Sequence, residues 1–270
     1  MTPLSDMTGI DWQDAFQTSD YIAGASDYPP RWAATAAAFR AKQWAQLDIA
    51  YGDHPRERFD LFLPQGTPKG LCVIVHGGFW LGFDKSSWSD MARGPVSHGW
   101  AVAMPSYVLA PEASLPDITS QIGRAVTVAA SMVAGPIQFT GHSAGGHLVT
   151  RLASIDGPLA PNIASRVDRV VSISGLHDLR PLLMHSMNEK LGLTEETAIQ
   201  ESSVLSRPMT GVRVSAWVGA AERPEFLRPS GLLAEIWGAN LVADPGKHHF
   251  DVIDGLKDAA HPLTLELVKN

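Results

Sequence analysis

The chain has 270 residues, of which 45% are hydrophobic and 18% are charged, with a net charge of −7. This composition is typical of a globular protein and excludes a disordered chain, which would have fewer apolar residues and a higher net charge. The 21 basic residues are scattered along the sequence, which argues against nucleic acid or an anionic membrane surface as a partner. The single cysteine, Cys72, excludes an internal disulfide framework and a cysteine-based metal site.

The first residues contain neither the basic nor the apolar region of a secretory signal. No apolar run approaches the ~20 residues that are needed to span a bilayer. We therefore expect a cytoplasmic protein that acts on a small molecule. The oligomeric state is left open, with a homodimer as one option.

Residues 1–45 are predicted to form a helical extension that packs on the body of the protein. Its main element is an alanine-rich helix over 31–45, which follows Pro29 and Pro30, because proline is favoured in the first turn of a helix. Three aromatic side chains are expected to fix this helix to the body: Trp32, Phe39 and Trp44.

Residues 46–270 are predicted to form one α/β domain, since short apolar runs alternate with helical stretches. Such runs are typical of strands buried on both faces, and the alternation indicates a mostly parallel sheet with helices on both faces. The expected strands are 46–51, 58–63, 70–75, 100–104, 137–140, 169–174, 212–218 and 240–243. The expected helices are 88–98, 115–133, 144–154, 224–237 and 249–268. The first two strands flank a turn and should pair antiparallel, and the second alternates, with Phe59, Leu61 and Leu63 on one face.

The segment Gly141-His142-Ser143-Ala144-Gly145 follows an expected strand and precedes an expected helix. It matches G-x-S-x-G, the turn that exposes a nucleophilic serine in α/β hydrolases. Small residues two positions before and after the serine are needed because strand becomes helix within a few residues. The alternative is an ordinary strand–turn–helix with glycines for packing.

A second glycine-rich motif, HGGFW, follows the strand 70–75. It resembles the HGGG-type loop that supplies backbone N–H groups to the oxyanion hole of some lipases and esterases. The expected donors are the N–H groups of Gly78, Phe79 and Ala144. His76 is expected to hydrogen-bond within the loop and to have no catalytic role.

In α/β hydrolases the acid and the base follow the serine in that order. After the strand 212–218 the sequence offers Glu222 and Glu225. Glu222 is favoured because Glu225 would lie in the first turn of the next helix, where a carboxylate serves the helix dipole. After the last strand the sequence offers His248 and His249 as the base, and the residues alone do not decide between them.

Five segments together resemble the kynurenine formamidase (arylformamidase) branch of the α/β hydrolases: HGGFW, GHSAGGHL, SGLHDLRPL, ERPEF and HHFDVID. The resemblance covers roughly residues 61–256. It implies the α/β-hydrolase fold and a triad of Ser143, Glu222 and His249. Family acids are usually aspartate, so Glu222 is a departure that lengthens the side chain by one methylene group.

The predicted reaction is acyl transfer through an acyl-enzyme on Ser143, with no metal and no cofactor. The resemblance implies N-formylkynurenine as one substrate, and the alternatives are a carboxylesterase for short-acyl esters or a non-catalytic binding protein of this fold. Trp80 and Tyr107 are predicted to bind substrate. Further candidates for the pocket wall are Phe79, Phe83, Trp88 and Met184 to Met187.

Overall fold

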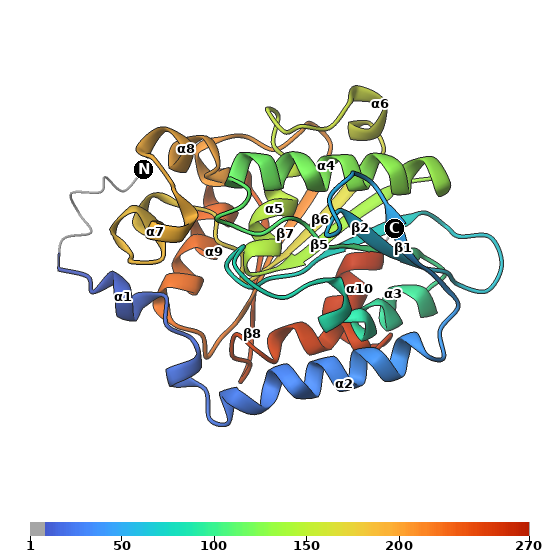
Figure 1. The fold of residues 1–270 in the computed structure, drawn as a ribbon, viewed down its shortest axis with the longest axis horizontal. Helices are drawn as coiled ribbons and strands as arrows, with labels where there is room; N and C mark the ends of the chain where they lie inside the picture. The colour runs from blue at the N-terminus through green and yellow to red at the C-terminus, as the bar shows by residue number, and fades with distance from the viewer. Residues whose placement is uncertain (1–8, 270) are drawn as a thin grey trace.

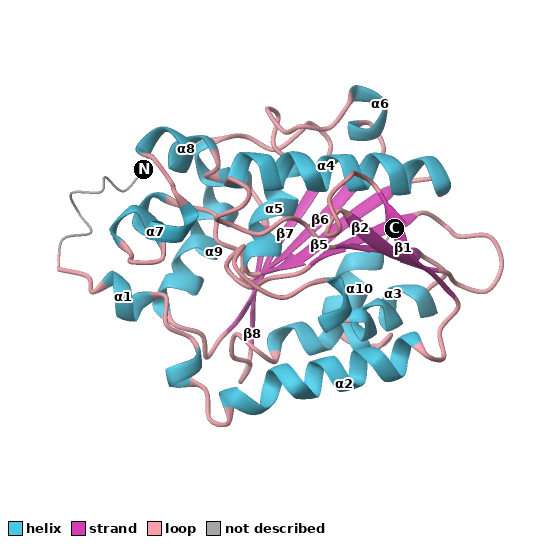
Figure 2. Ribbon diagram, viewed as in Figure 1, coloured by secondary structure: helices cyan, strands magenta, loops and turns pink. Residues whose placement is uncertain are grey.

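The computed structural model describes residues 9–269 and is organised around one twisted eight-stranded sheet (Figures 1 and 2). The strands are β1 (Ala45–Ala50), β2 (Arg58–Phe62), β3 (Leu71–Val75), β4 (Ala101–Pro105), β5 (Ile137–His142), β6 (Val167–Ile173), β7 (Arg213–Gly219) and β8 (Asn240–Asp244). Their order across the sheet is β1-β2-β4-β3-β5-β6-β7-β8. The pairs β1/β2 and β2/β4 are antiparallel and the other pairs are parallel.

Helices cover both faces of the sheet, as Figure 2 shows. The α-helices are α1 (Trp12–Ala15), α2 (Tyr28–Arg40), α3 (Arg93–Ser97), α4 (Leu115–Met132), α5 (Ala144–Leu152), α6 (Pro161–Ala164), α7 (Asn188–Leu191), α8 (Glu195–Gln200), α9 (Pro224–Trp237) and α10 (Pro262–Val268). Helices α4, α5 and α9 contribute to one hydrophobic core and α2 and α10 to the other. The predicted mostly parallel sheet with helices on both faces is confirmed.

Seven 3₁₀ helices connect these elements in the described part of the chain. They are η2 (Ser19–Tyr21), η3 (Ala25–Asp27), η4 (Lys85–Ser87), η5 (Ser89–Ala92), η6 (Arg180–Met184), η7 (Ser203–Leu205) and η8 (Val252–Lys257). Two predicted helices are divided by them. The stretch 88–98 forms η5 and α3, and the stretch 249–268 forms η8 and α10. In the second case His261 caps a new helix, because its ring accepts a hydrogen bond from Leu263 N, and Pro262 begins that helix.

The N-terminal helix differs from its predicted bounds. Helix α2 begins at Tyr28, so that both prolines lie in its first turn, where their missing N–H groups are not needed. It ends at Arg40, and Ala45 already belongs to β1. Trp32 and Phe39 are buried as predicted, but the prediction for Trp44 is wrong, since its side chain is 64% exposed.

Strand β2 also differs from the prediction. Residues Phe59 to Phe62 are all buried, because β2 lies inside the sheet between β1 and β4 and has a core on each face. The polar residue in this run, Asp60, is neutralised by Lys85 Nζ at 2.7 Å. Among the described residues no helix is long and apolar enough to cross a membrane.

Candidate active site

Ser143 lies at the apex of a sharp turn between β5 and α5. Its backbone has φ 56° and ψ −117°, a conformation that L-residues rarely adopt. The turn is possible only with glycine on both sides: a Cβ on Gly145 would lie 2.0 Å from the carbonyl oxygen of Val75, and one on Gly141 would lie 2.3 Å from that of Gly145. The Oγ of Ser143 makes no hydrogen bond among the described residues, and Ser143 lines a cavity.

The HGGFW loop packs against this turn. A Cβ on Gly77 would lie 3.2 Å from Ser143 Cβ, so a larger residue would push the loop away from the serine. Gly78, Phe79 and Trp80 all have positive φ, which keeps the backbone turned sharply after β3. Among the described residues the N–H groups of Gly78, Phe79 and Ala144 donate no hydrogen bond. These three donors are therefore free to bind an oxyanion.

His76 stabilises the start of this loop. Its Nδ1 donates to the carbonyl of Gly77 at 2.8 Å, which agrees with the hydrogen bond expected from the sequence. Its ring stacks on Tyr107 with centroids 4.3 Å apart. Burial lowers the pKa of His76 to about 4, so the ring is neutral at pH 7.

Glu222 and His249, from the segments that follow β7 and β8, are brought together. His249 Nδ1 donates to Glu222 Oε2 at 2.6 Å, and both side chains are buried. The other carboxylate oxygen, Oε1, accepts from Ser174 Oγ at 2.5 Å and from the Gly219 N–H at 2.8 Å. Two donors on one oxygen hold the carboxylate plane, so that the second oxygen can orient the imidazole.

The alternative residues lie elsewhere. Glu225 is in the first turn of α9 and pairs with Arg228 at 2.9 Å. The His248 ring contacts the Tyr28 hydroxyl at 3.1 Å and Asp251 at 3.2 Å. Neither makes a hydrogen bond to the Glu222–His249 pair, so the geometry favours Glu222 and His249 as acid and base.

Two neighbours of His249 did not emerge from the sequence. His142 Nε2 donates to the His249 carbonyl at 2.8 Å, and its pKa lies well below the usual value because the ring is buried. The Phe226 ring packs against the His249 ring with centroids 4.2 Å apart. Only tertiary structure brings these segments together, so no sequence signal could have identified them.

The cavity beside Ser143 has a volume of about 680 Å³, which is within the range of small-molecule sites. Phe79, Phe83, Trp88 and Met187 line it as predicted. The structure corrects the prediction for Trp80 and Tyr107, which are fully buried and do not line the cavity. Trp80 packs edge-on against His147 and Tyr107 stacks on His76, so both support the oxyanion loop from behind.

The N-terminal segment forms the wall that sequence reasoning missed. Phe16 and Trp32 line the cavity, together with polar residues that lie between them in the sequence. In Figure 1 this blue segment runs past α7 and then along the face that carries α10. The segment had been expected only to pack on the body, because it lies outside the residues that carry the family resemblance.

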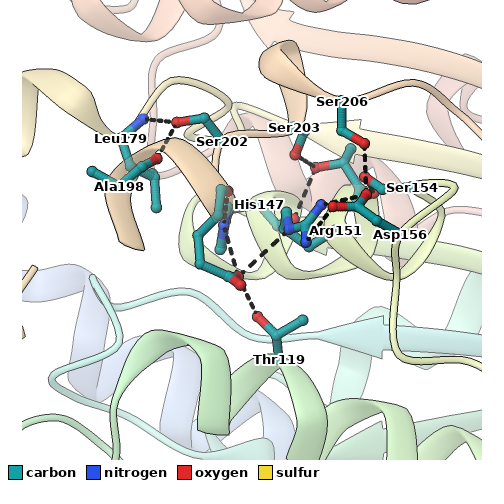
Figure 3. A network of polar contacts seen from close by, with 12 residues as sticks. Thr119, His147, Arg151, Ser154, Asp156, Leu179, Ala198, Ser202, Ser203 and Ser206 are labelled. Atoms are coloured by element: carbon teal, nitrogen blue, oxygen red, sulfur yellow. Dashed lines mark hydrogen bonds and ion pairs between the residues drawn. The ribbon is translucent and has the colours of Figure 1, made fainter. Parts of the chain in front are cut away.

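A buried polar network anchors α5, the helix that follows Ser143 (Figure 3). His147 Nε2 donates to the carbonyl of Glu201 at 2.8 Å. The carboxylate of Glu201 accepts from Thr119 Oγ1 at 2.7 Å and lies 3.6 Å from Arg151 Nε. The network ties α5 to α4 and to the end of α8, and so fixes the helix that begins directly after Ser143.

No group of three potential metal ligands occurs among residues 9–269. His142 and His147, which flank the serine in the sequence, donate hydrogen bonds to the carbonyls of His249 and Glu201.

Replacing Ser174 with alanine should lower kcat roughly tenfold with little change in KM, because a hydrogen bond to a charged group contributes about 1.5–3 kcal/mol. Glu222 would keep only the Gly219 N–H on that oxygen. Steady-state kinetics with any ester that the wild-type enzyme hydrolyses would measure kcat and KM of this variant. Ser172→Ala is the matched control, since Ser172 lies two residues earlier and contacts His177. Equal losses in both variants would contradict the role of Ser174.

Comparison with known proteins gives a consistent result. The family model BD-FAE matches residues 59–218. Kynurenine formamidase of Salmo salar is 29% identical over 248 residues, which cover 85% of this chain and 84% of the relative. A solved structure from Silicibacter sp. TM1040, provisionally described as a thioesterase, is 50% identical with a TM-score of 0.92, covering 96% of this chain and 99% of that one.

More distant structures share the fold. Inhibited esterase B from Lactobacillus rhamnosis has a TM-score of 0.65 at 17% identity, covering 90% of this chain and 92% of that one. The mostly parallel sheet, the structural neighbours and the relatives together identify the fold as that of the α/β hydrolases and the chemistry as hydrolysis of esters or formamides by a serine hydrolase.

Proposed function

Since the chain belongs to the BD-FAE family and resembles the kynurenine formamidases, we propose that it is a hydrolase of aryl formamides or short-acyl esters with Ser143 as nucleophile, His249 as base and Glu222 as acid. The observation that carries the proposal is the 2.6 Å contact of His249 Nδ1 with Glu222 Oε2. It lies beside the cavity that Ser143 and His249 line together.

In the proposed mechanism His249 Nε2 takes the proton of Ser143 Oγ as the oxygen attacks the substrate carbonyl. Glu222 holds the imidazole in the required tautomer and stabilises the imidazolium that forms. The oxyanion accepts hydrogen bonds from Gly78, Phe79 and Ala144, and in comparable sites the loss of one donor costs about 3–4 kcal/mol. His249 then protonates the leaving amine or alcohol, and water releases the acyl group by the same steps.

The first candidate substrate class is the aryl formamides, among them N-formylkynurenine. A formyl group needs very little acyl space, whereas the aromatic leaving group needs an apolar wall, and Phe79, Phe83 and Trp88 line the cavity. The proposed substrate is a small molecule in the cytoplasm, in keeping with the sequence prediction.

Short-acyl esters are the second candidate class, because a cavity of about 680 Å³ is larger than a formyl group requires. The provisional thioesterase description of the Silicibacter relative adds thioesters, which would react by the same attack on a carbonyl.

The testing experiment compares steady-state hydrolysis of N-formyl-L-kynurenine, p-nitrophenyl acetate, p-nitrophenyl butyrate and S-phenyl thioacetate, with Ser143→Ala as the blank. Formamide turnover that disappears in the blank would support the formamidase assignment. Ester or thioester turnover alone would support the esterase assignment. If no substrate is turned over and a fluorophosphonate probe does not label Ser143, the proposal is wrong and a binding role is favoured.

A further inference from the structure

The N-terminal segment supplies a large share of the catalytic cavity. Nine of the twenty lining residues lie between Gln13 and Trp32, outside the region that matches the BD-FAE model. Tyr28 fixes this segment to the loop of the catalytic base, because its hydroxyl contacts the His248 ring at 3.1 Å and its ring packs on Phe250. This segment is therefore in a position to determine which substrates reach Ser143.

The wall of the cavity carries no formal charge in the part of the chain that the structure describes, since no lining residue is Asp, Glu, Lys or Arg. Two of its histidines, His142 and His185, have pKa values lowered by burial and are neutral at pH 7. The acidic residues of the N-terminal segment next to the lining, Asp14, Asp20 and Asp27, do not themselves line the cavity, and Asp14 pairs with Arg223.

The apolar part of the wall is a cluster of aromatic rings. Trp32 packs against Trp88 and Phe250 with centroids 5.1 and 5.3 Å apart, and Phe83 packs on Trp88 at 4.9 Å. Phe83 is 40% exposed, so one of its faces is free for a ligand. A planar ring could stack on this cluster.

The polar part of the wall consists of neutral groups. Gln17, Ser19 and Ser26 line the cavity, and their side chains make no hydrogen bond among the described residues. Their hydroxyl and amide groups can pair with a carbonyl or hydroxyl of a ligand, but none of them can neutralise a carboxylate or an ammonium group.

We infer that the substrate is an uncharged aromatic ester or N-aryl formamide, and that molecules with an ionised amino-acid head are discriminated against. The inference rests on the proposed function and specifies its substrate class. N-formylkynurenine carries both a carboxylate and an ammonium group. Moving these groups out of water against a wall without charged partners is unfavourable. The same aryl formamide without that head avoids the cost of desolvating the two charges.

The test uses two matched pairs of substrates. The formamide pair is 2-formamidoacetophenone, which lacks the amino-acid head, and N-formyl-L-kynurenine. The ester pair is phenyl acetate and 4-acetoxybenzoate. For each pair that the wild-type enzyme hydrolyses, kcat/KM for the neutral substrate should exceed kcat/KM for the charged substrate by about tenfold or more.

A charge added to the cavity should narrow this preference. Gln17→Arg places a guanidinium in the wall at an exposed position, and we expect it to lower the neutral-to-charged ratio of kcat/KM by about fivefold or more. Gln200→Arg is the matched control, since Gln200 is exposed at the end of α8 and does not line the cavity. It adds the same charge to the protein and should leave the ratio unchanged.

Each outcome decides the inference. The inference is supported if the wild type prefers the neutral substrate of each pair and if the neutral-to-charged ratio of kcat/KM falls in Gln17→Arg but not in Gln200→Arg. Equal or faster turnover of N-formyl-L-kynurenine or 4-acetoxybenzoate by the wild type overturns it while leaving the proposed function intact. If Gln17→Arg leaves the neutral-to-charged ratio of kcat/KM unchanged, the uncharged wall is not the cause of the preference and the inference is refuted. Absence of all ester and formamide turnover, with no fluorophosphonate labelling of Ser143, defeats the proposed function and the inference together.

Discussion

Replacing Ser143 with alanine is expected to lower kcat about a millionfold, and adding His249→Ala should lower it no further, because residues of a triad act as a unit. Without the hydroxyl there is no nucleophile, and without the imidazole the hydroxyl is not activated. Each variant should retain a residual rate from the proposed oxyanion donors, the N–H groups of Gly78, Phe79 and Ala144. The single variant His249→Ala should be nearly as slow as the double variant.

The measurement is single-turnover kinetics on the best substrate, at enzyme concentrations that make the residual rates visible. His248→Ala is the matched control: it removes the adjacent histidine, whose ring contacts Tyr28 and Asp251. We expect this control to stay within a few-fold of wild type. A collapse of activity in His248→Ala, or multiplied losses in the Ser143/His249 double variant, would refute the proposed triad.

The second large effect is expected on stability in acid. Four buried histidines have pKa values lowered by burial: to about 4 for His76, to about 3 for His147 and His177, and well below the usual value for His142. Three of them donate a ring N–H to a backbone carbonyl, and His177 lies between Ser172 and Thr150. Burial outweighs these hydrogen bonds and keeps the rings neutral. Protonating any of them in the folded state would place a positive charge in a buried site, and within residues 9–269 only His147 among the four has a carboxylate oxygen, Glu201 Oε2, within 4 Å of its ring, at 3.9 Å.

The sign of the effect follows from proton binding. Below the ordinary histidine pKa of about 6.5 the unfolded chain takes up protons that the folded chain refuses, so stability is fully present above pH 6.5 and is lost as pH falls toward 4. Each such proton contributes a slope of about 1.4 kcal/mol per pH unit. For the four buried histidines together, the free energy of unfolding changes by about 5 kcal/mol per pH unit, whereas the total stability of a protein is typically about 5–15 kcal/mol. The protein should therefore unfold on mild acidification.

Urea unfolding between pH 7.5 and 4.5 measures this slope. The variant His147→Gln keeps a donor for the Glu201 carbonyl and removes one titrating ring, so the slope should fall by about a quarter. Val149→Ala, also on α5 and fully buried, should lower stability by the same amount at every pH. A slope that is unchanged in His147→Gln would show that its ring does not contribute.

Local features of the chain were determined by the sequence itself. The apolar runs and the helical stretches between them predicted all eight strands within a few residues. The inner strands were readable because a strand buried on both faces is apolar along most of its length, whereas the edge strands β1 and β8 are largely exposed. The serine turn was also readable, since the clashes that a Cβ would make at Gly141 and Gly145 leave glycine as the residue that fits. Glu222 was favoured over Glu225 from its distance to a predicted helix.

Tertiary structure decided what surrounds these features. Trp80 and Tyr107 follow strands near the site and are aromatic, yet they face the core, since the direction of a side chain in a loop depends on packing rather than on spacing. Ser174, His142 and Phe226 become neighbours of Glu222 and His249 only because β5, β6 and β7 lie side by side. The cavity is closed by the N-terminal segment, which is more than a hundred residues from Ser143 in sequence. Its uncharged wall is thus a property of the fold, because local patterns cannot show which distant segments share a cavity.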